Sequence, residues 1–176
     1  MKPVLLVVWW SMTGASWQLA QAAALRGTEA VLEGPSAGLA AHPAVDVRLV
    51  RADHADATDV LLASACLFVM PEMLGSMAGR MKDFFDRAYY GALDRMNGRP
   101  YGIIVAAGSD GQGAVRQAER IATGWRMRCV VDPLIVCTHA QNSDRILAPK
   151  VVAEADLARA GEVGATLALG LQMGLW

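Results

Sequence analysis

An uninterrupted apolar run near the N-terminus, residues 4–10 (VLLVVWW), constrains the fold more than any other feature of the sequence. Branched and aromatic residues without polar alternation are typical of a strand that is buried on both faces, as in a parallel sheet. The run ends in a polar loop, residues 11–16 (SMTGAS), and a helical pattern follows over residues 17–25. This arrangement can hold a phosphate, because the first amides of a helix lack partners and the helix dipole favours negative charge.

The loop itself carries groups that suit a phosphate. Ser11, Thr13 and Ser16 supply hydroxyl donors, and Gly14 lets the backbone approach a ligand closely. The loop contains no Lys or Arg, so it differs from the nucleotide P-loop, which ends in Gly-Lys-Ser/Thr. Taken alone, the same residues are equally compatible with an ordinary hydroxyl-capped helix start.

Four further strands and four further helices are predicted along the chain. Residues 45–50 alternate between apolar and polar side chains, which is typical of a half-exposed edge strand. We expect Pro71 to end the third strand and Pro133 to mark a bulge or an edge position in the fifth. Residues 27–44 are expected to form a long connection, in which residues 29–33 are also compatible with a continued helix. The remaining strands are predicted over residues 66–70, 101–107 and 129–137, and the helices over residues 58–62, 78–90, 114–123 and 151–171.

Strands that alternate with helices in this way predict one α/β domain over residues 1–176, with a doubly wound, five-stranded parallel sheet and helices on both faces. The strand order 2-1-3-4-5 suits a chain of this length, and ligands then bind beyond the carboxyl ends of strands one, three and four. The loops at those ends, residues 11–16, 71–77 and 108–113, are rich in Gly, Ser or Thr. Residues 51–56, which follow strand two, contain no glycine. The turn residues therefore gather at one predicted crevice.

Composition limits the classes of function. The formal net charge is −1, from 16 basic and 17 acidic residues, so we expect no nucleic-acid partner and no attraction to anionic membranes. No apolar stretch reaches the ~20 residues of a membrane-spanning helix, so no membrane insertion is expected. Cys66, Cys129 and Cys137 lie in apolar runs without metal-ligand spacing, which favours buried thiols of a cytoplasmic protein. The hydrophobic share of 54% suits a covered sheet and an apolar subunit contact.

The three loops, and the helix after the second one, resemble those of the flavodoxin-like superfamily, specifically its NAD(P)H-dependent FMN reductase and multimeric flavodoxin group. Residues 11–16 resemble the family's Ser-x-Thr-Gly-x-Ser/Thr phosphate loop. Residues 71–77 (PEMLGSM) and 79–87 (GRMKDFFDR) resemble its Pro-x-Tyr-x-Gly-Ser-Met segment and the helix that follows. Residues 107–113 (AGSDGQG) resemble its third, glycine-rich loop, so the resemblance covers about residues 4–138.

The resemblance implies an FMN-binding oxidoreductase that passes hydride from NAD(P)H through FMN to a quinone, a flavin or a similar small acceptor. It implies that the first loop binds the FMN phosphate, that the other two flank the isoalloxazine ring, and that the chain forms a homodimer or homotetramer. Because the cofactor supplies the hydride chemistry, no catalytic side chain and no metal ligand is expected. The implied cofactor-binding residues are Ser11, Met12, Thr13, Gly14, Ala15, Ser16, Pro71, Glu72, Met73, Leu74, Gly75, Ser76, Ala107, Gly108, Ser109, Asp110 and Gly111.

Met73 departs from the family pattern, which often places a Tyr there to stack on the flavin. A thioether packs on a ring less strongly than an aromatic side chain, so weaker FMN binding is expected. Trp10, just before the first loop, could compensate, although a strand Trp more often serves the core.

Three alternatives stay open. A flavodoxin-type electron carrier would bind FMN without its own NAD(P)H reductase activity, but such carriers usually have the acidic docking face that this near-neutral chain lacks. A flavodoxin-like protein that has lost FMN could serve assembly or regulation. A small serine hydrolase would use Ser109 as nucleophile, with Asp132 and His139 following in the order Ser, Asp, His.

Three other features have plain interpretations. Lys82 and Asp86 are spaced for a surface ion pair. Arg87 is expected to be solvated, with a phosphate or a neighbouring subunit as the alternative partner. His139 is expected to be an exposed loop residue, with a place beside the nicotinamide as the alternative.

Overall fold

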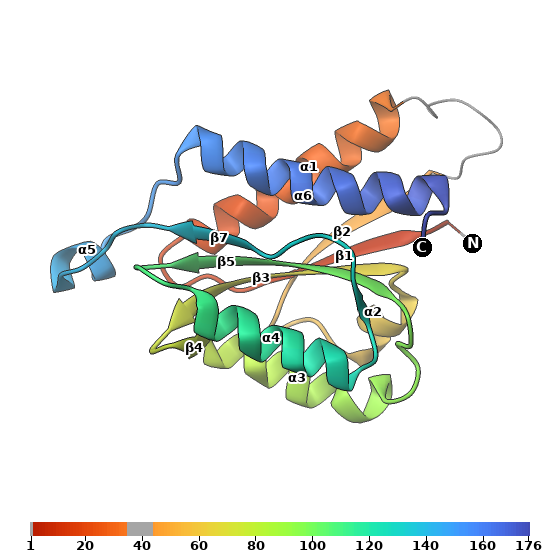
Figure 1. Cartoon of the computed structure of the whole chain (residues 1–176), viewed down its shortest axis with the longest axis horizontal. Helices are drawn as coiled ribbons and strands as arrows, with labels where there is room; N and C mark the ends of the chain where they lie inside the picture. Colours follow the sequence, from red (N-terminus) through yellow and green to blue (C-terminus); the bar gives the residue numbers. More distant parts are fainter. Residues whose placement is uncertain (1, 35–43) are drawn as a thin grey trace.

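The computed structural model describes residues 2–34 and 44–176, and within them seven strands form one sheet between two layers of helices (Figure 1). The strand order is β2 (Asp46–Arg51), β1 (Val4–Trp9), β3 (Ala65–Met73), β5 (Pro100–Ala107), all paired in parallel. Beyond β5, two short parallel strands pair with its two ends, β6 (Arg128–Cys129) and β7 (Leu134–Cys137). The predicted doubly wound order 2-1-3-4-5 is therefore confirmed when β6 and β7 are counted as one fifth strand.

The fifth strand is interrupted where a single strand over residues 129–137 was expected. The amide of Val130 still donates to the carbonyl oxygen of Tyr101 (3.2 Å), residues 131–133 leave the ladder, and pairing with β5 resumes at Leu134. Pro133 has no N–H to donate to the ladder, which accounts for a break rather than a simple bulge. Cys129, which was expected to be buried, is exposed at the end of β6, whereas Cys66 in β3 is buried and Cys137 is partly buried.

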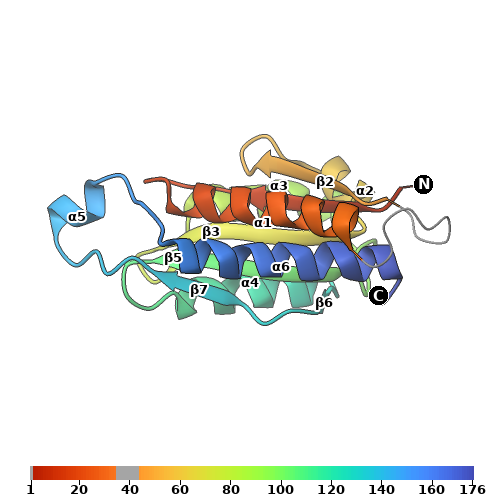
Figure 2. The ribbon, with the colours of Figure 1, turned by 90° about the horizontal axis from the view of Figure 1, so that it is seen from above.

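Helices cover both faces of the sheet, as the alternation of strands and helices predicted. In Figures 1 and 2, α1 (Ala15–Glu33) and α6 (Glu154–Met173) lie side by side over one face. The opposite face is covered by α2 (Ala57–Leu62), α3 (Gly79–Ala92) and α4 (Gln112–Gly124). The short helix α5 (Ser143–Leu147), which the sequence did not predict, projects beyond the carboxyl edge of the sheet. No helix of the described residues is both long enough and apolar enough to span a bilayer.

Helix α1 is longer than expected, and it contains Gly27, which we had placed in a loop. A Cβ on Gly27 would lie 3.1 Å from the carbonyl oxygen of Gly164 in α6, so the two glycines let the helices approach closely. Tertiary packing thus offsets the low helix propensity of glycine, which is roughly 1 kcal/mol less favourable than Ala. The expected connection is therefore wrong at residues 27 and 28, the helical alternative for residues 29–33 is confirmed, and residues 35–43 lie outside the described residues.

Strand β3 continues through Pro71, which was expected to end it. Parallel pairing reaches Pro71, and the chain then turns back at Met73 into the short antiparallel strand β4 (Ser76–Met77). The carbonyl oxygen of Pro71 accepts a hydrogen bond from the amide of Ala78 (3.1 Å). Because proline has no N–H, it takes part in strand pairing only as a hydrogen-bond acceptor.

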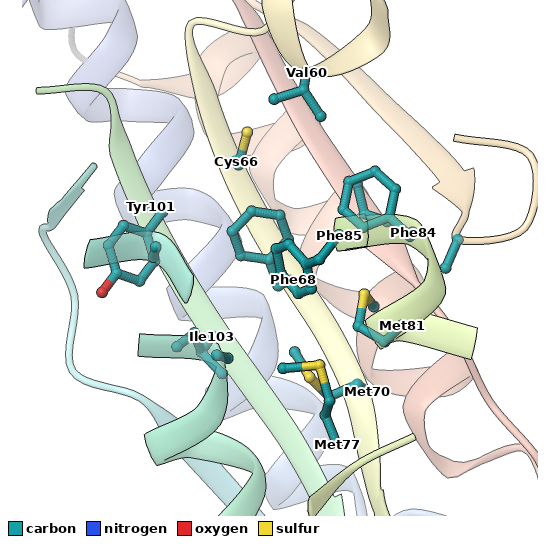
Figure 3. Packing of buried hydrophobic residues seen from close by; sticks show 14 of the residues in the cluster. Val60, Cys66, Phe68, Met70, Met77, Met81, Phe84, Phe85, Tyr101 and Ile103 are labelled. Carbon is teal, nitrogen blue, oxygen red and sulfur yellow. The ribbon is translucent and has the colours of Figure 1, made fainter. Parts of the chain in front are cut away.

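The two faces of the sheet have separate apolar cores. Figure 3 shows part of the core beneath α2, α3 and α4, in which Phe68 of β3 meets Phe84 and Phe85 of α3. The ring centroids of Phe68 and Phe85 lie 4.9 Å apart, within the range of favourable aromatic pairs. This packing fixes β3 against α3, and it thereby fixes the position of the loop that joins them.

Candidate functional site

The three predicted loops meet at a cavity of about 360 Å³ beyond the carboxyl ends of β1, β3 and β5. This volume lies within the range of small-molecule and cofactor sites. The predicted residues that line it are Ser11, Met12, Thr13, Ala15, Ser16, Pro71, Glu72, Met73, Ala107 and Gly108. The predicted residues that do not line it are Gly14, Leu74, Gly75, Ser76, Ser109, Asp110 and Gly111. Residues that sequence reasoning missed also line it: Ala106, Thr138, Ala140, Ile146, Leu147 and Lys150.

The start of α1 forms one end of the cavity. Gly14 takes a left-handed conformation (φ 95°) as the residue before the helix, and its amide donates to Oγ of Ser11 (3.0 Å). No side chain caps the helix, so its first amides are available to a ligand. The Ser16 side chain is buried at 1% exposure, and its Oγ has no hydrogen-bond partner in the structure. A buried hydroxyl without a partner is unusual, and it marks a place where a ligand acceptor would be favoured.

The second loop is a tight hairpin between β3 and β4. Leu74 and Gly75 both have positive φ values, 53° and 73°, which is the backbone pattern of a two-residue turn that matches sheet twist. Glycine takes this conformation without strain, whereas Leu74 takes it with its side chain fully exposed at the tip. The hairpin therefore presents Met73 to the cavity and holds Leu74 and Gly75 away from it.

Glu72 joins the second loop to the third through its side chain. Its carboxylate accepts hydrogen bonds from the amides of Gly111 (2.7 Å) and Ala114 (3.2 Å) at the start of α4. A negative charge is favourable at a helix N-terminus. Gly111 is one of the residues that the resemblance implies for the cofactor, and in the structure its amide donates to this carboxylate.

Gly113 allows the second loop to pack against α4. A Cβ on Gly113 would overlap the carbonyl oxygen of Gly75. The third loop is closed on its other side by Thr138, whose amide and hydroxyl both donate to the carbonyl oxygen of Ala107 (2.8 and 3.1 Å). Close backbone packing at Gly113 and the two hydrogen bonds from Thr138 therefore hold the loops in addition to the Glu72 side chain.

A segment far along the chain completes the wall beside the first loop. The amide of Lys150 donates to the carbonyl oxygen of Thr13 (2.7 Å), and Nε2 of Gln18 donates to the carbonyl oxygen of Lys150 (2.7 Å). These contacts join positions more than a hundred residues apart, and no local pattern in the sequence predicts them. Lys150 brings a cation to a cavity whose first loop has none.

Arg87 and Trp10 take positions away from the cavity. Arg87 donates to the carbonyl oxygens of Ala52 (2.6 Å) and Ala55 (2.7 Å), so it fastens α3 to the chain after β2 and is not a phosphate ligand. Trp10 lies just after β1 in a neighbouring groove, with the guanidinium carbons of Arg51 and Arg80 at 5.7 and 6.0 Å from its ring centroid. The expected ion pair of Lys82 and Asp86 is present on α3 at 2.6 Å.

The structure does not assemble the serine hydrolase arrangement. Asp132 precedes β7 and His139 follows it, so the strand separates them by more than ~10 Å at about 3.3 Å per residue. Asp132 therefore cannot orient the imidazole of His139 beside Ser109. His139 itself is exposed, as expected, in a left-handed conformation (φ 53°). The described residues also contain no cluster of His, Cys, Asp or Glu that could hold a metal ion.

Residues 57–142 match the family described as NADPH-dependent FMN reductase. The match covers just under half of the chain and includes the second and third loops. It confirms the resemblance to the FMN reductase group that those loops indicated. Among curated proteins, no sequence matches the chain.

Solved structures with the same fold include several flavodoxins. A flavodoxin from the domain Archaea is 15% identical, with a TM-score of 0.71 over 96% of this chain and 98% of that one. The flavodoxin of Streptococcus pneumonia TIGR4 is 19% identical, with a TM-score of 0.68 over 94% and 98% of the two chains. A flavodoxin, WrbA-like protein from Agrobacterium tumefaciens is 15% identical, with a TM-score of 0.68 over 98% and 99%. The shared fold is that of flavodoxins, and together with the family match it supports an FMN-binding flavoprotein.

Proposed function

With the flavodoxin-like fold and the FMN reductase match as premises, we propose that this chain binds FMN in the cavity and acts as an NAD(P)H-dependent oxidoreductase. FMN, when bound, supplies the chemistry by which hydride passes from NAD(P)H to a quinone, a flavin or a similar small acceptor. The observation that carries the proposal is the meeting of three loops, separated along the chain, at one cavity beside the uncapped start of α1.

The groups around the first loop fit a phosphate. The residues Ser11, Thr13 and Ser16 line the cavity, and Oγ of Ser16 is buried without a partner. The amides at the start of α1 add donors and a partial positive charge of roughly half a unit. A phosphate here would receive hydrogen bonds that the protein alone leaves unmade.

The other two loops fit a ring. Pro71, Met73 and Ala107 line the cavity with predominantly apolar surface. Gly108 lines it as well, and because it has no side chain it leaves room for a ring beside the third loop. Backbone amides of these loops are the donors that we assign to the polar edge of the flavin. A donor near that edge would stabilise negative charge on the reduced ring.

The chain's own residues position the cofactor and do not enter the hydride chemistry. Glu72 and Lys150 are the two charged residues that line the cavity. Glu72 accepts hydrogen bonds from the amides of Gly111 and Ala114 at the start of α4 and so has a structural role. We therefore assign no catalytic acid, base or nucleophile to the site.

The proposal includes a homodimer or homotetramer. Met12, Leu74 and Leu147 are exposed apolar side chains at or beside the cavity, and a second subunit would cover such a surface. Sedimentation velocity on the purified protein tests this part, because a monomer at micromolar concentration would contradict it.

Absorbance spectroscopy tests the main proposal. We expect flavin bands between 300 and 550 nm that stay with the protein through desalting after incubation with FMN. Bleaching of these bands by NADPH or NADH without oxygen, and recovery with a quinone, would support the reductase. Retained FMN that neither nucleotide bleaches would instead indicate an electron carrier. A protein that retains no FMN would contradict both.

A further inference from the structure

We propose that Lys150 is a phosphate-binding residue of the cavity, supplying from the C-terminal part of the chain the cation that the first loop lacks. The proposal rests on the proposed function, because the phosphate concerned is that of bound FMN. The chemistry required of the ligand is a phosphate monoester placed against residues 11–16.

Backbone contacts hold Lys150 against the first loop. Its amide donates to the carbonyl oxygen of Thr13 (2.7 Å), and its carbonyl oxygen accepts from Nε2 of Gln18 (2.7 Å). The same Nε2 donates to the carbonyl oxygen of Gly14 (3.0 Å), and Oε1 of Gln18 accepts from the amide of Val152 (3.1 Å). Lys150 is thus tied to the residues that begin α1, and its position does not depend on its own side chain.

Without Lys150, the groups around the cavity would not balance the negative charge of a phosphate. A phosphate monoester carries a charge of about −1.5 to −2 at neutral pH, whereas the start of a helix contributes only about +0.5. The hydroxyls of Ser11, Thr13 and Ser16 carry no charge, and the carboxylate of Glu72 adds a negative one. Lys150 is the sole basic residue among those that line the cavity.

The ammonium group has one donor to spare. Nζ of Lys150 donates to the carbonyl oxygens of Ile146 (3.0 Å) and Ala148 (2.5 Å), at the end of α5. An ammonium group has three N–H donors, so these two neutral partners leave one for a phosphate oxygen. A hydrogen bond from this ammonium group to a phosphate oxygen joins two ionised groups, and charge-assisted bonds are about twice as strong as bonds between neutral groups.

This arrangement links phosphate binding to α5. The helix has no buried residue. It is held by the Asn142 side chain, which caps its start, and by the hydrogen bonds that Nζ of Lys150 donates to carbonyl oxygens at its end. Ile146 and Leu147 of α5 line the cavity although both side chains are exposed. A phosphate that fixes Nζ would therefore steady α5, and with it this apolar part of the cavity wall.

A comparison of FMN with riboflavin tests the proposal, because riboflavin lacks the phosphate. Dissociation constants of both are measured by flavin fluorescence for the wild type, Lys150→Gln, Lys150→Arg and the control Lys82→Gln, whose ammonium pairs with Asp86 on α3. We expect Lys150→Gln to weaken FMN binding about tenfold or more, to leave riboflavin binding unchanged, and to reduce the salt dependence of FMN binding. Lys150→Arg should retain much of the affinity, and Lys82→Gln all of it.

The possible results separate this proposal from the function on which it rests. Wild-type protein that binds FMN, together with Lys150→Gln that binds it equally well, would overturn the role of Lys150 alone. An equal loss for FMN and riboflavin would also overturn it, because the residue would then only support the fold. Wild-type protein that binds neither flavin would overturn the proposed function and the role of Lys150 with it. Thermal unfolding of each variant identifies any that fails to fold, and Lys150→Met, which keeps the aliphatic stem, then replaces Lys150→Gln.

Discussion

The carboxylate of Glu72 accepts a hydrogen bond from the amide of Gly111 at 2.7 Å, and this contact ties the loop after β3 to the start of α4. The same carboxylate also binds the amide of Ala114. One acidic side chain thus sets the spacing of the two loops that we assign to the flavin ring. Its negative charge is favourable at the start of the helix.

Replacing Glu72 with Ala should therefore destabilise the protein. Two backbone amides at the start of α4 would lose their acceptor, which costs roughly 1–3 kcal/mol for a buried donor. Urea unfolding of the wild type and Glu72→Ala measures the difference. Asp110→Ala is the matched control, since this exposed acidic residue of the same loop contacts neither amide. A Glu72→Ala variant as stable as Asp110→Ala would contradict the bridging role.

Replacing Gly113 with Ala should displace the second loop. The new Cβ would overlap the carbonyl oxygen of Gly75, and backbone cannot move aside as easily as the end of a side chain. We expect a loss of stability of about 2 kcal/mol, in the range of overpacking substitutions, together with weaker flavin binding. Gly124→Ala, at the other end of α4 with open space around it, should be close to neutral. Differential scanning calorimetry of the two variants provides the comparison.

Ser16→Ala should affect stability and FMN affinity differently. The Ser16 hydroxyl is buried without a partner, so its removal should leave the stability of the flavin-free protein unchanged or slightly raised. FMN affinity should fall about tenfold, because the phosphate would lose a donor. Ser11→Ala should lower both, since Oγ of Ser11 accepts from the Gly14 amide. If Ser16→Ala instead destabilises the flavin-free protein and binds FMN normally, the hydroxyl has no part in phosphate binding.

Met73→Tyr tests the expected weakness of the ring contact. Met73 lines the cavity and is 39% exposed, so an aromatic side chain has room there. An aromatic contact adds about 0.5–1.5 kcal/mol beyond area burial, which corresponds to a gain in affinity of up to about tenfold. The gain should be equal for FMN and riboflavin, because both carry the same ring. Fluorescence titration with each flavin measures it, and unchanged affinities would place Met73 away from the ring.

The thiols of Cys66 and Cys129 should differ in reactivity. Burial raises the pKa of the Cys66 thiol to about 12, and partial desolvation also raises the pKa of Cys129, but the Cys129 thiol is open to a reagent whereas Cys66 is buried. A disulfide reagent at pH 8 should modify Cys129 readily and reach Cys66 only after unfolding, because the thiolate is the reactive form. Timed reaction with mass spectrometry distinguishes the sites, and early labelling of Cys66 in folded protein would contradict its burial.

The same burial predicts a pH dependence of stability. The folded state holds the Cys66 proton more tightly than the unfolded chain does, so the contribution of this group is full below about pH 9. It falls as the pH rises toward 12, because the unfolded thiol ionises first. Cys66→Ala should flatten this part of a stability profile measured by urea unfolding, and an equally steep profile in the variant would assign the loss to other groups.

Much of the fold could be predicted from local sequence. A strand covered on both faces must be apolar at every position, so β1 and β5 are visible as runs without polar alternation. The three glycine- and hydroxyl-bearing loops follow β1, β3 and β5, and the parallel order brings them to one edge of the sheet. For the same reason, most residues of the first loop could be assigned to the cavity before the structure was known.

Only the tertiary structure decided which of those residues face the cavity and which hold the loops. Gly27 lies in a helix because Gly164 of α6 packs closely against it, and the amide of Gly111 is occupied because Glu72 reaches it from another loop. Lys150 meets Thr13 and Gln18 only when the last helix has packed against the first. Local patterns encode burial and turns, since these depend on neighbouring residues. Contacts between segments more than a hundred residues apart depend on how whole elements pack, and short stretches of sequence carry no periodic signal of that packing.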